Sequence, residues 1–116
     1  MPDKYESFAA MRDAEKDFHI GVNWRNSPTS IIAIHGGKIE KGTAEIASAI
    51  ARDDYSYYAL IGNKSKGNTD LHLTSNNYDE PLCQALVNQS ERVISVHGCK
   101  DDPASPDRII LGGMDG

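Results

Sequence analysis

Two apolar segments of the chain end in the same way, and they constrain the fold more than any other feature. Residues 30–35 read SIIAIH and residues 92–97 read RVISVH, and a glycine follows each of them directly. An apolar run without alternation is typical of a strand that is covered on both faces, as in a parallel sheet. Two such strands separated by helix-forming segments favour a layered α/β domain.

The rest of the pattern alternates between helix and strand signals within one domain. A length of 116 residues is sufficient for one hydrophobic core. Residues 18–24 alternate apolar and polar side chains, which predicts a half-buried strand at a sheet edge. The fold class is therefore α/β, with a mixed, largely parallel sheet flanked by helices. The predicted helices lie near 5–15, 42–54 and 79–91, and the predicted strands at 18–24, 30–35, 55–62, 71–75, 92–97 and 108–113.

Helix-capping signals support two of these helices. Gly42 or Thr43 is suited to begin the second helix, and Glu45 falls in its first turn, where the helix dipole favours a carboxylate. Asp79 is suited to be the N-cap of the third helix, because Pro81 is tolerated in the first turn.

Composition excludes several classes of protein. The net charge is −5 and no basic cluster is present, which argues against a nucleic-acid partner. No window approaches the ~20 apolar residues of a membrane span. The N-terminal sequence MPDKYESFAA lacks the apolar core of a secretory signal, so we expect a cytoplasmic protein, or one released by cell or phage lysis. Cys83 and Cys99 are expected to be free thiols.

The histidines that end the two apolar strands are the strongest candidates for chemistry. Ligands of α/β sheets bind beyond the carboxyl ends of the strands, and His35 and His97 meet there if their strands are neighbours. Glu40 follows a glycine turn that is long enough to fold back to His35. Two imidazoles and one carboxylate form the ligand set of a catalytic zinc. A structural role for each histidine is the competing interpretation, and Glu45 competes with Glu40, although Glu45 already suits the helix dipole.

Other candidate motifs carry weaker signals. The HGG sequence at 35–37 is similar to an oxyanion loop, but no G-x-S-x-G elbow accompanies it. The sequence GNKSKGN at 62–68 lacks the Lys and Ser/Thr that a phosphate loop requires after its second glycine. His72 is either a core or surface histidine or a group that contacts substrate, and Asp79 could alternatively orient a ligand histidine.

Three segments in order, AIHGGKIEKGTAEIASAIA, LHLTSNNYDEP and VISVHG, resemble the poly-γ-glutamate hydrolase family of phages and bacilli. The resemblance covers residues 17–115, and GGMD at 112–115 fits the same pattern. It implies a fold similar to that of zinc carboxypeptidases and a single, incomplete domain over residues 1–116, because family members extend beyond the end of this chain.

The resemblance also implies an activity and a ligand set. It implies a zinc ion held by His35, Glu40 and His97, and cleavage of γ-glutamyl amide bonds in a polyanionic polymer. A glutamate general base is expected beyond Gly116, so the catalytic base is unknown within this sequence. Because the chain itself is acidic, local cations must attract such a substrate; Lys38 and Lys41 are the first candidates, with Arg25 and Lys100 weaker.

Two alternatives to polymer hydrolysis stay open at this stage. One is a metal-binding domain that lacks its general base, whose absence typically costs ~10²–10⁴ in rate. The other is an amidohydrolase for a different γ-glutamyl peptide, because the sequence does not define the walls of the cleft. The oligomeric state is not readable from the sequence.

Overall fold

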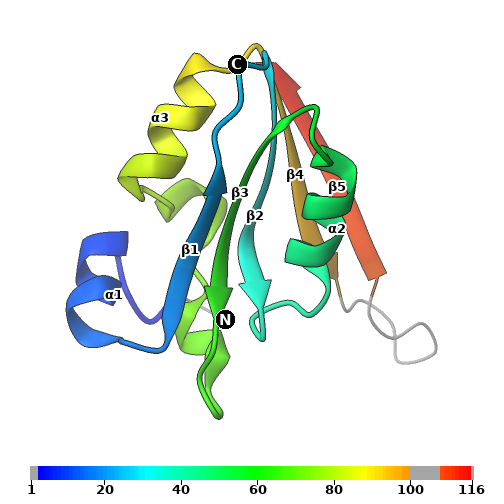
Figure 1. Cartoon of the computed structure of the whole chain (residues 1–116). Helices are drawn as coiled ribbons and strands as arrows, with labels where there is room; N and C mark the ends of the chain where they lie inside the picture. Colours follow the sequence, from blue (N-terminus) through cyan, green and yellow to red (C-terminus); the bar gives the residue numbers. More distant parts are fainter. Residues whose placement is uncertain (1–2, 100–107, 116) are drawn as a thin grey trace.

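A five-stranded mixed sheet with helices on both faces forms the centre of the computed structural model, which describes residues 3–99 and 108–115 (Figure 1). The strands are β1 (Phe18–Asn23), β2 (Thr29–Gly37), β3 (Ser56–Gly62), β4 (Arg92–Cys99) and β5 (Arg108–Asp115). The α-helices are α1 (Phe8–Ala14), α2 (Thr43–Ala51) and α3 (Pro81–Gln89), and two short 3-10 turns are η1 (Asn68–Leu71) and η2 (Ser75–Asn77).

The strand order β1-β3-β2-β4-β5 places the two histidine-ending strands side by side. β2 pairs in parallel with both β3 and β4, while β1 and β5 pair antiparallel at the two edges. Every residue of β2 except the last is buried, as the unalternating apolar run predicts. The predicted mixed α/β architecture is confirmed, and the strand at 18–24 does lie at an edge.

Alternate residues of β2 pack against different layers. Ile31 and Ala33 face α2, whose buried residues include Ala44 and Ala47. Ile32 and Ile34 face the opposite layer and share a cluster with residues of α3. The helices therefore cover both faces of the sheet (Figure 1), which explains why this strand carries apolar side chains without alternation. None of the helices in the described ranges is both long and apolar enough to cross a membrane.

The prediction of a strand at 71–75 is wrong. η1 ends at Leu71, η2 begins at Ser75, and the residues between them belong to no strand. Leu71 and Leu73 are both fully buried, in one cluster with Phe8 and Met11 of α1. The alternation of 71–75 thus arises from two leucines that pack beneath a helix, and not from pairing in the sheet.

The prediction that Asp79 caps the third helix is also wrong. Glu80 is the N-cap of α3, and its side chain accepts hydrogen bonds of 2.9 Å from the backbone N–H groups of Leu82 and Cys83. Asp79 instead accepts a 2.7 Å hydrogen bond from the backbone N–H of Phe8 and so joins α3 to α1. For α2, the structure confirms Gly42 as the N-cap and Glu45 in the first turn.

Candidate metal centre

His35 lies near the carboxyl end of β2, and its ring is held in one orientation. The side chain is almost fully buried, and its Nε2 lies 2.6 Å from the backbone carbonyl oxygen of Leu73. Because a carbonyl can only accept a hydrogen bond, Nε2 must carry the proton. In the neutral ring, Nδ1 therefore presents a lone pair.

Glu40 returns to His35 through the turn between β2 and α2. Its backbone N–H donates a 2.9 Å hydrogen bond to the carbonyl of His35, and the Thr43 hydroxyl donates to the same carbonyl at 3.2 Å. Oε1 of Glu40 then lies 3.2 Å from Nδ1 of His35. Gly37 is required for this path, because it has a φ of +65° and an added Cβ would lie 2.6 Å from the carbonyl oxygen of Gly62.

His97 reaches the same point from the neighbouring parallel strand. Its Nδ1 lies 3.8 Å from Oε1 of Glu40, and its ring centroid is 5.3 Å from that of His35. The hydroxyl of Ser95 is 2.8 Å from Nε2 of His97 and steadies the ring. The next residue, Gly98, donates its backbone N–H to Oε1 of Glu40 at 3.0 Å. The two strand–His–Gly segments thus converge on one carboxylate.

Ionisation at this point favours the forms that bind a metal. Burial opposes the charge of Glu40, but its contact with the His35 ring and the hydrogen bond from the backbone N–H of Gly98 outweigh it and lower the pKa of the carboxyl. Burial, and then the proximity of His35, lower the pKa of His97 despite the opposing charge of Glu40. A deprotonated carboxylate and a neutral imidazole are the ligand forms of these side chains.

His72 completes the cluster from the segment between η1 and η2. Its ring stacks on that of His35, with centroids 3.9 Å apart and an angle of 22° between the planes. Its Nε2 lies 4.0 Å from Oε2 of Glu40, and its Nδ1 lies 3.5 Å from Oδ1 of Asp3. His35, Glu40 and His72 each offer a ligand atom within 4.8 Å of the others. The structure therefore brings together four side chains rather than three.

The predicted cations lie in different places. Lys38 and Lys41 are exposed on the turn that carries Glu40, beside the cluster. Arg25 is at the opposite end of the sheet, where its guanidinium donates a 2.8 Å hydrogen bond to the carbonyl of Tyr55, next to the start of β3. Lys100 lies outside the described residues. Glu45 is exposed on α2, so Glu40 is the carboxylate that meets His35.

Two neighbours of the cluster were not predicted from the sequence. Ser95 lies two residues before His97, on the same face of β4, and this period-two spacing is a signal that could have identified it. No local sequence pattern identifies Asp3 as a neighbour of the cluster, because it lies near the N-terminus, far along the chain from His72.

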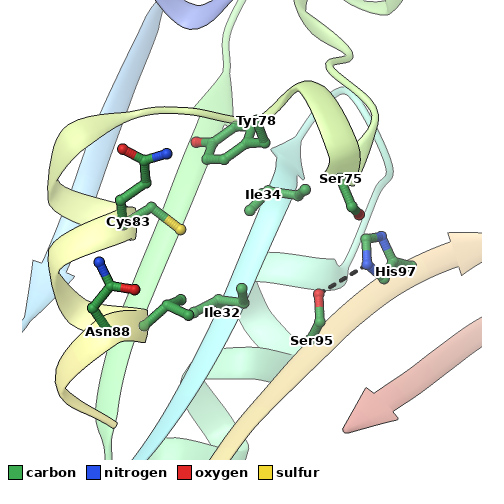
Figure 2. A pocket seen from close by; sticks show the side chains of 10 residues that line it. Ile32, Ile34, Ser75, Tyr78, Cys83, Asn88, Ser95 and His97 are labelled. Atoms are coloured by element: carbon green, nitrogen blue, oxygen red, sulfur yellow. Dashed lines mark hydrogen bonds between the residues drawn. The ribbon is translucent and has the colours of Figure 1, made fainter. Parts of the chain in front are cut away.

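A cleft of about 520 Å³ opens beside His97, between α3 and the strands β2 and β4. Figure 2 shows His97 and Ser95 on the β4 side of this cleft, with Cys83 and Asn88 on the α3 side and Tyr78 near one end. Cys83 is a free thiol, and burial followed by the charge of Glu80 raises its pKa to about 12. The side chain of Cys99 lies outside the described residues.

The cluster fits a divalent metal such as zinc on its own chemistry. The lone pair of His35 Nδ1 faces a carboxylate oxygen at 3.2 Å, so two acceptors meet without a donor between them unless a cation is shared. Imidazole nitrogens with one carboxylate are a common zinc ligand set, and the neighbours of His35 and His97 supply the outer hydrogen bonds that such ligands require.

The sequence of this chain is similar to a family model and to two Bacillus subtilis proteins. The family model for poly-gamma-glutamate hydrolase matches residues 3–116. The UPF0714 protein YndL of Bacillus subtilis (strain 168) is 37% identical over 115 residues, which are 97% of this chain and 44% of YndL. The UPF0714 protein YmaC of the same bacterium is 34% identical over 117 residues, covering 98% of this chain and 48% of YmaC.

Two solved structures share the fold. A bacteriophage poly-gamma-glutamate hydrolase gives a TM-score of 0.83 at 31% identity, over 88% of this chain and 51% of that one. The apo, zinc-free form of YndL gives a TM-score of 0.76 at 34% identity, over 85% of this chain and 55% of that one. The chain spans about half the length of the relatives it matches. The family match and these similarities show that the chain belongs to the poly-gamma-glutamate hydrolase family.

Proposed function

We propose that this protein is a zinc-dependent hydrolase that cleaves γ-glutamyl amide bonds of poly-γ-glutamate, with the zinc held by His35, Glu40 and His97. The observation that carries the proposal is that Nδ1 of His35 and Nδ1 of His97 lie 3.2 and 3.8 Å from the same oxygen, Oε1 of Glu40, at the carboxyl ends of two adjacent parallel strands. Membership of the family supports the reaction, and the description of the similar YndL structure as zinc-free supports the choice of metal.

Ring geometry favours His97 over His72 as the third ligand. A ligand nitrogen directs its lone pair within the plane of its ring. The rings of His35 and His72 are stacked and nearly parallel. A nitrogen lone pair of one ring therefore lies in a plane above that of the other, and the two are poorly placed to bind the same metal ion. The ring of His97 is tilted by 58° to that of His35, which allows the two Nδ1 lone pairs to point at one position.

A zinc ion in this position would polarise the amide carbonyl and lower the pKa of a bound water. Neighbouring residues fix the orientation of the side chains that would bind the zinc ion. Leu73 and Ser95 fix the imidazoles of His35 and His97, and the backbone N–H of Gly98 fixes the carboxylate of Glu40. Lys38 and Lys41, exposed on the adjoining turn, would attract an anionic polymer to an otherwise acidic chain.

The test measures the chain length of poly-γ-glutamate, by viscosity or by gel electrophoresis, during incubation with zinc-loaded protein. We expect shortening of the polymer that a chelator stops and that added zinc restores. His35→Ala removes the activity, whereas His19→Ala, which alters an exposed histidine of β1, leaves it unchanged.

The outcomes of this experiment separate the alternatives. Stoichiometric zinc binding without any amide cleavage would contradict the hydrolase proposal and identify a metal-binding module. Cleavage of short γ-glutamyl peptides but not of the polymer would contradict the proposed substrate and retain the reaction. Polymer cleavage at full rate in the absence of any metal would contradict the role of zinc.

A further inference from the structure

Asp3 is buried beside the candidate metal centre with half of its hydrogen-bonding capacity unused. Its side chain is 6% exposed. Among the side chains of residues 3–98, its Oδ1 is the one buried oxygen or nitrogen found without a hydrogen-bond partner. A buried carboxylate oxygen without a donor is costly, so such an atom points to a partner that must supply a proton.

The other carboxylate oxygen of Asp3 anchors the segment that carries His72. Oδ2 accepts hydrogen bonds from the backbone N–H and the hydroxyl of Thr74, at 2.8 and 3.2 Å, and from the side-chain amide of Asn77 at 3.1 Å. Burial opposes the charge of Asp3, but the hydrogen bonds from this segment outweigh it and lower the pKa of the carboxyl. Asp3 is therefore an ionised acceptor in a fixed position.

The atom that faces the unused Oδ1 is Nδ1 of His72, at 3.5 Å. Since Oδ1 can only accept, this arrangement favours the ring form in which Nδ1 carries the hydrogen. Nε2, on the far side of the ring, then has a lone pair. It lies 4.0 Å from Oε2 of Glu40, the carboxylate oxygen that His35 and Gly98 do not contact.

We propose that Asp3 is a positioning residue that holds His72 as the Nδ1–H form, so that Nε2 of His72 accepts a hydrogen bond from an N–H or O–H group bound in the metal centre. The acceptor is separate from the zinc ligands, because the stacking of His72 on His35 directs its lone pair along a parallel plane. The amide N–H of a γ-glutamyl substrate and a water molecule are the donors of suitable chemistry. This inference deepens the proposed function and rests on it for the identity of that donor.

The placement of the proton is measured on the metal-free protein by two-dimensional long-range ¹H–¹⁵N spectra of the histidine rings at a pH where they are neutral. We expect His72 in the wild-type protein to show a protonated Nδ1 and an unprotonated Nε2. A wild-type His72 that carries its proton on Nε2 overturns the proposal without any variant being made.

Asp3→Asn is the sharpest variant. The amide oxygen of Asn can still accept from Thr74 and Asn77, while its NH₂ group would donate to Nδ1 of His72. We therefore expect the proton of His72 to move to Nε2, with the proton positions in His19 and His35 unchanged. Asp54→Asn, at an exposed carboxylate before β3, is the matched control and should alter none of these signals. Unchanged His72 signals in folded Asp3→Asn would also overturn the proposal.

Zinc titration tests the separation of His72 from the ligands. We expect zinc to move the Nδ1 signals of His35 and His97 into the metal-bound range and to leave Nε2 of His72 outside it. His72→Ala should still bind one zinc per chain, with a Kd raised by no more than the ~10–100-fold that loss of an outer contact costs, because His72 supplies no ligand atom. A metal-bound Nε2 signal from His72 would refute the acceptor role, whereas a wild-type protein that binds no zinc would refute the proposed function and leave the Asp3–His72 result intact.

Discussion

The backbone N–H of Gly98 donates a 3.0 Å hydrogen bond to Oε1 of Glu40, and this contact ties the strand β4 to the turn that follows β2. An added Cβ at Gly98 would lie 3.1 Å from Cβ of Glu40, so a glycine is needed for the close approach. The glycine that follows His97 therefore leaves room for the side chain of Glu40 to approach β4.

Gly98→Ala should weaken zinc binding more than it weakens the fold. The new methyl group must displace Glu40 by a few tenths of an ångström and lengthen its hydrogen bond, so we expect a loss of ~10-fold or more in zinc affinity. The measurement is a zinc titration against a competing chelator. Gly21→Ala is the control, because an added Cβ there meets its nearest atom at 3.8 Å. Equal zinc affinity in the two variants would contradict the prediction.

Zinc should stabilise the protein through His97 but not through His19. A ligand that binds only the folded state adds about 2.7 kcal/mol to the free energy of unfolding at a concentration 100 times its Kd. We expect zinc to raise the Tm of the wild type and of His19→Ala, and to leave the Tm of His97→Ala unchanged, in thermal unfolding scans with and without chelator. A zinc-induced rise in His97→Ala equal to that of the wild type would show that His97 is not a ligand.

Ser95→Ala should weaken zinc binding without removing it. The serine hydroxyl is 2.8 Å from Nε2 of His97, and loss of such an outer contact typically costs 10–100-fold in metal affinity. The zinc Kd of this variant is compared with that of Ser48→Ala, which alters an exposed serine of α2. A change below 2-fold, on the order of RT ln 2, would mean that the ring of His97 is held by its packing alone.

Acid should destabilise the metal-free protein in two steps. The pKa of His97 is lowered in the folded state from the ordinary value of 6.5, and that of Glu40 from 4.5. The unfolded chain therefore binds more protons than the folded one as the pH falls, and the stability present above each ordinary pKa is lost on acidification. We expect the Tm to begin to fall below pH 6.5 and to fall further below pH 4.5.

The first step of this acid profile belongs to His97 and can be assigned by substitution. His97→Gln should flatten the Tm profile in the region just below pH 6.5, while His19→Gln, at an exposed site, should leave it as in the wild type. A Tm that rises as the pH falls through this region would have the wrong sign for the proposed environment of His97.

Loss of the Glu80 cap should destabilise the fold without affecting the metal site. Glu80 is buried and accepts two backbone hydrogen bonds at the start of α3. Glu80→Ala should lower the free energy of unfolding by about 1–2 kcal/mol, measured by urea denaturation. Glu91→Ala, at an exposed position beyond the same helix, should change it by less than about 0.5 kcal/mol.

The features of this protein that its sequence predicts are those that depend on residues close together in the chain. The unalternating apolar runs specify buried parallel strands, and each run ends at the sheet edge where ligands bind, so His35 and His97 were identified from local pattern alone. Glu40 is five residues from His35, within reach of a single turn, and its meeting with His35 follows from that short connection.

Only the tertiary structure decided the surroundings of the centre. The alternation of 71–75 is indistinguishable from that of a strand until α1 packs over Leu71 and Leu73, which leaves His72 free to stack on His35. Asp3 meets His72 and Thr74 across about 70 residues of chain, a separation over which no local pattern carries information. The physical reason is that strand and turn signals arise from neighbouring residues, whereas the partners of a buried polar side chain depend on how distant elements pack.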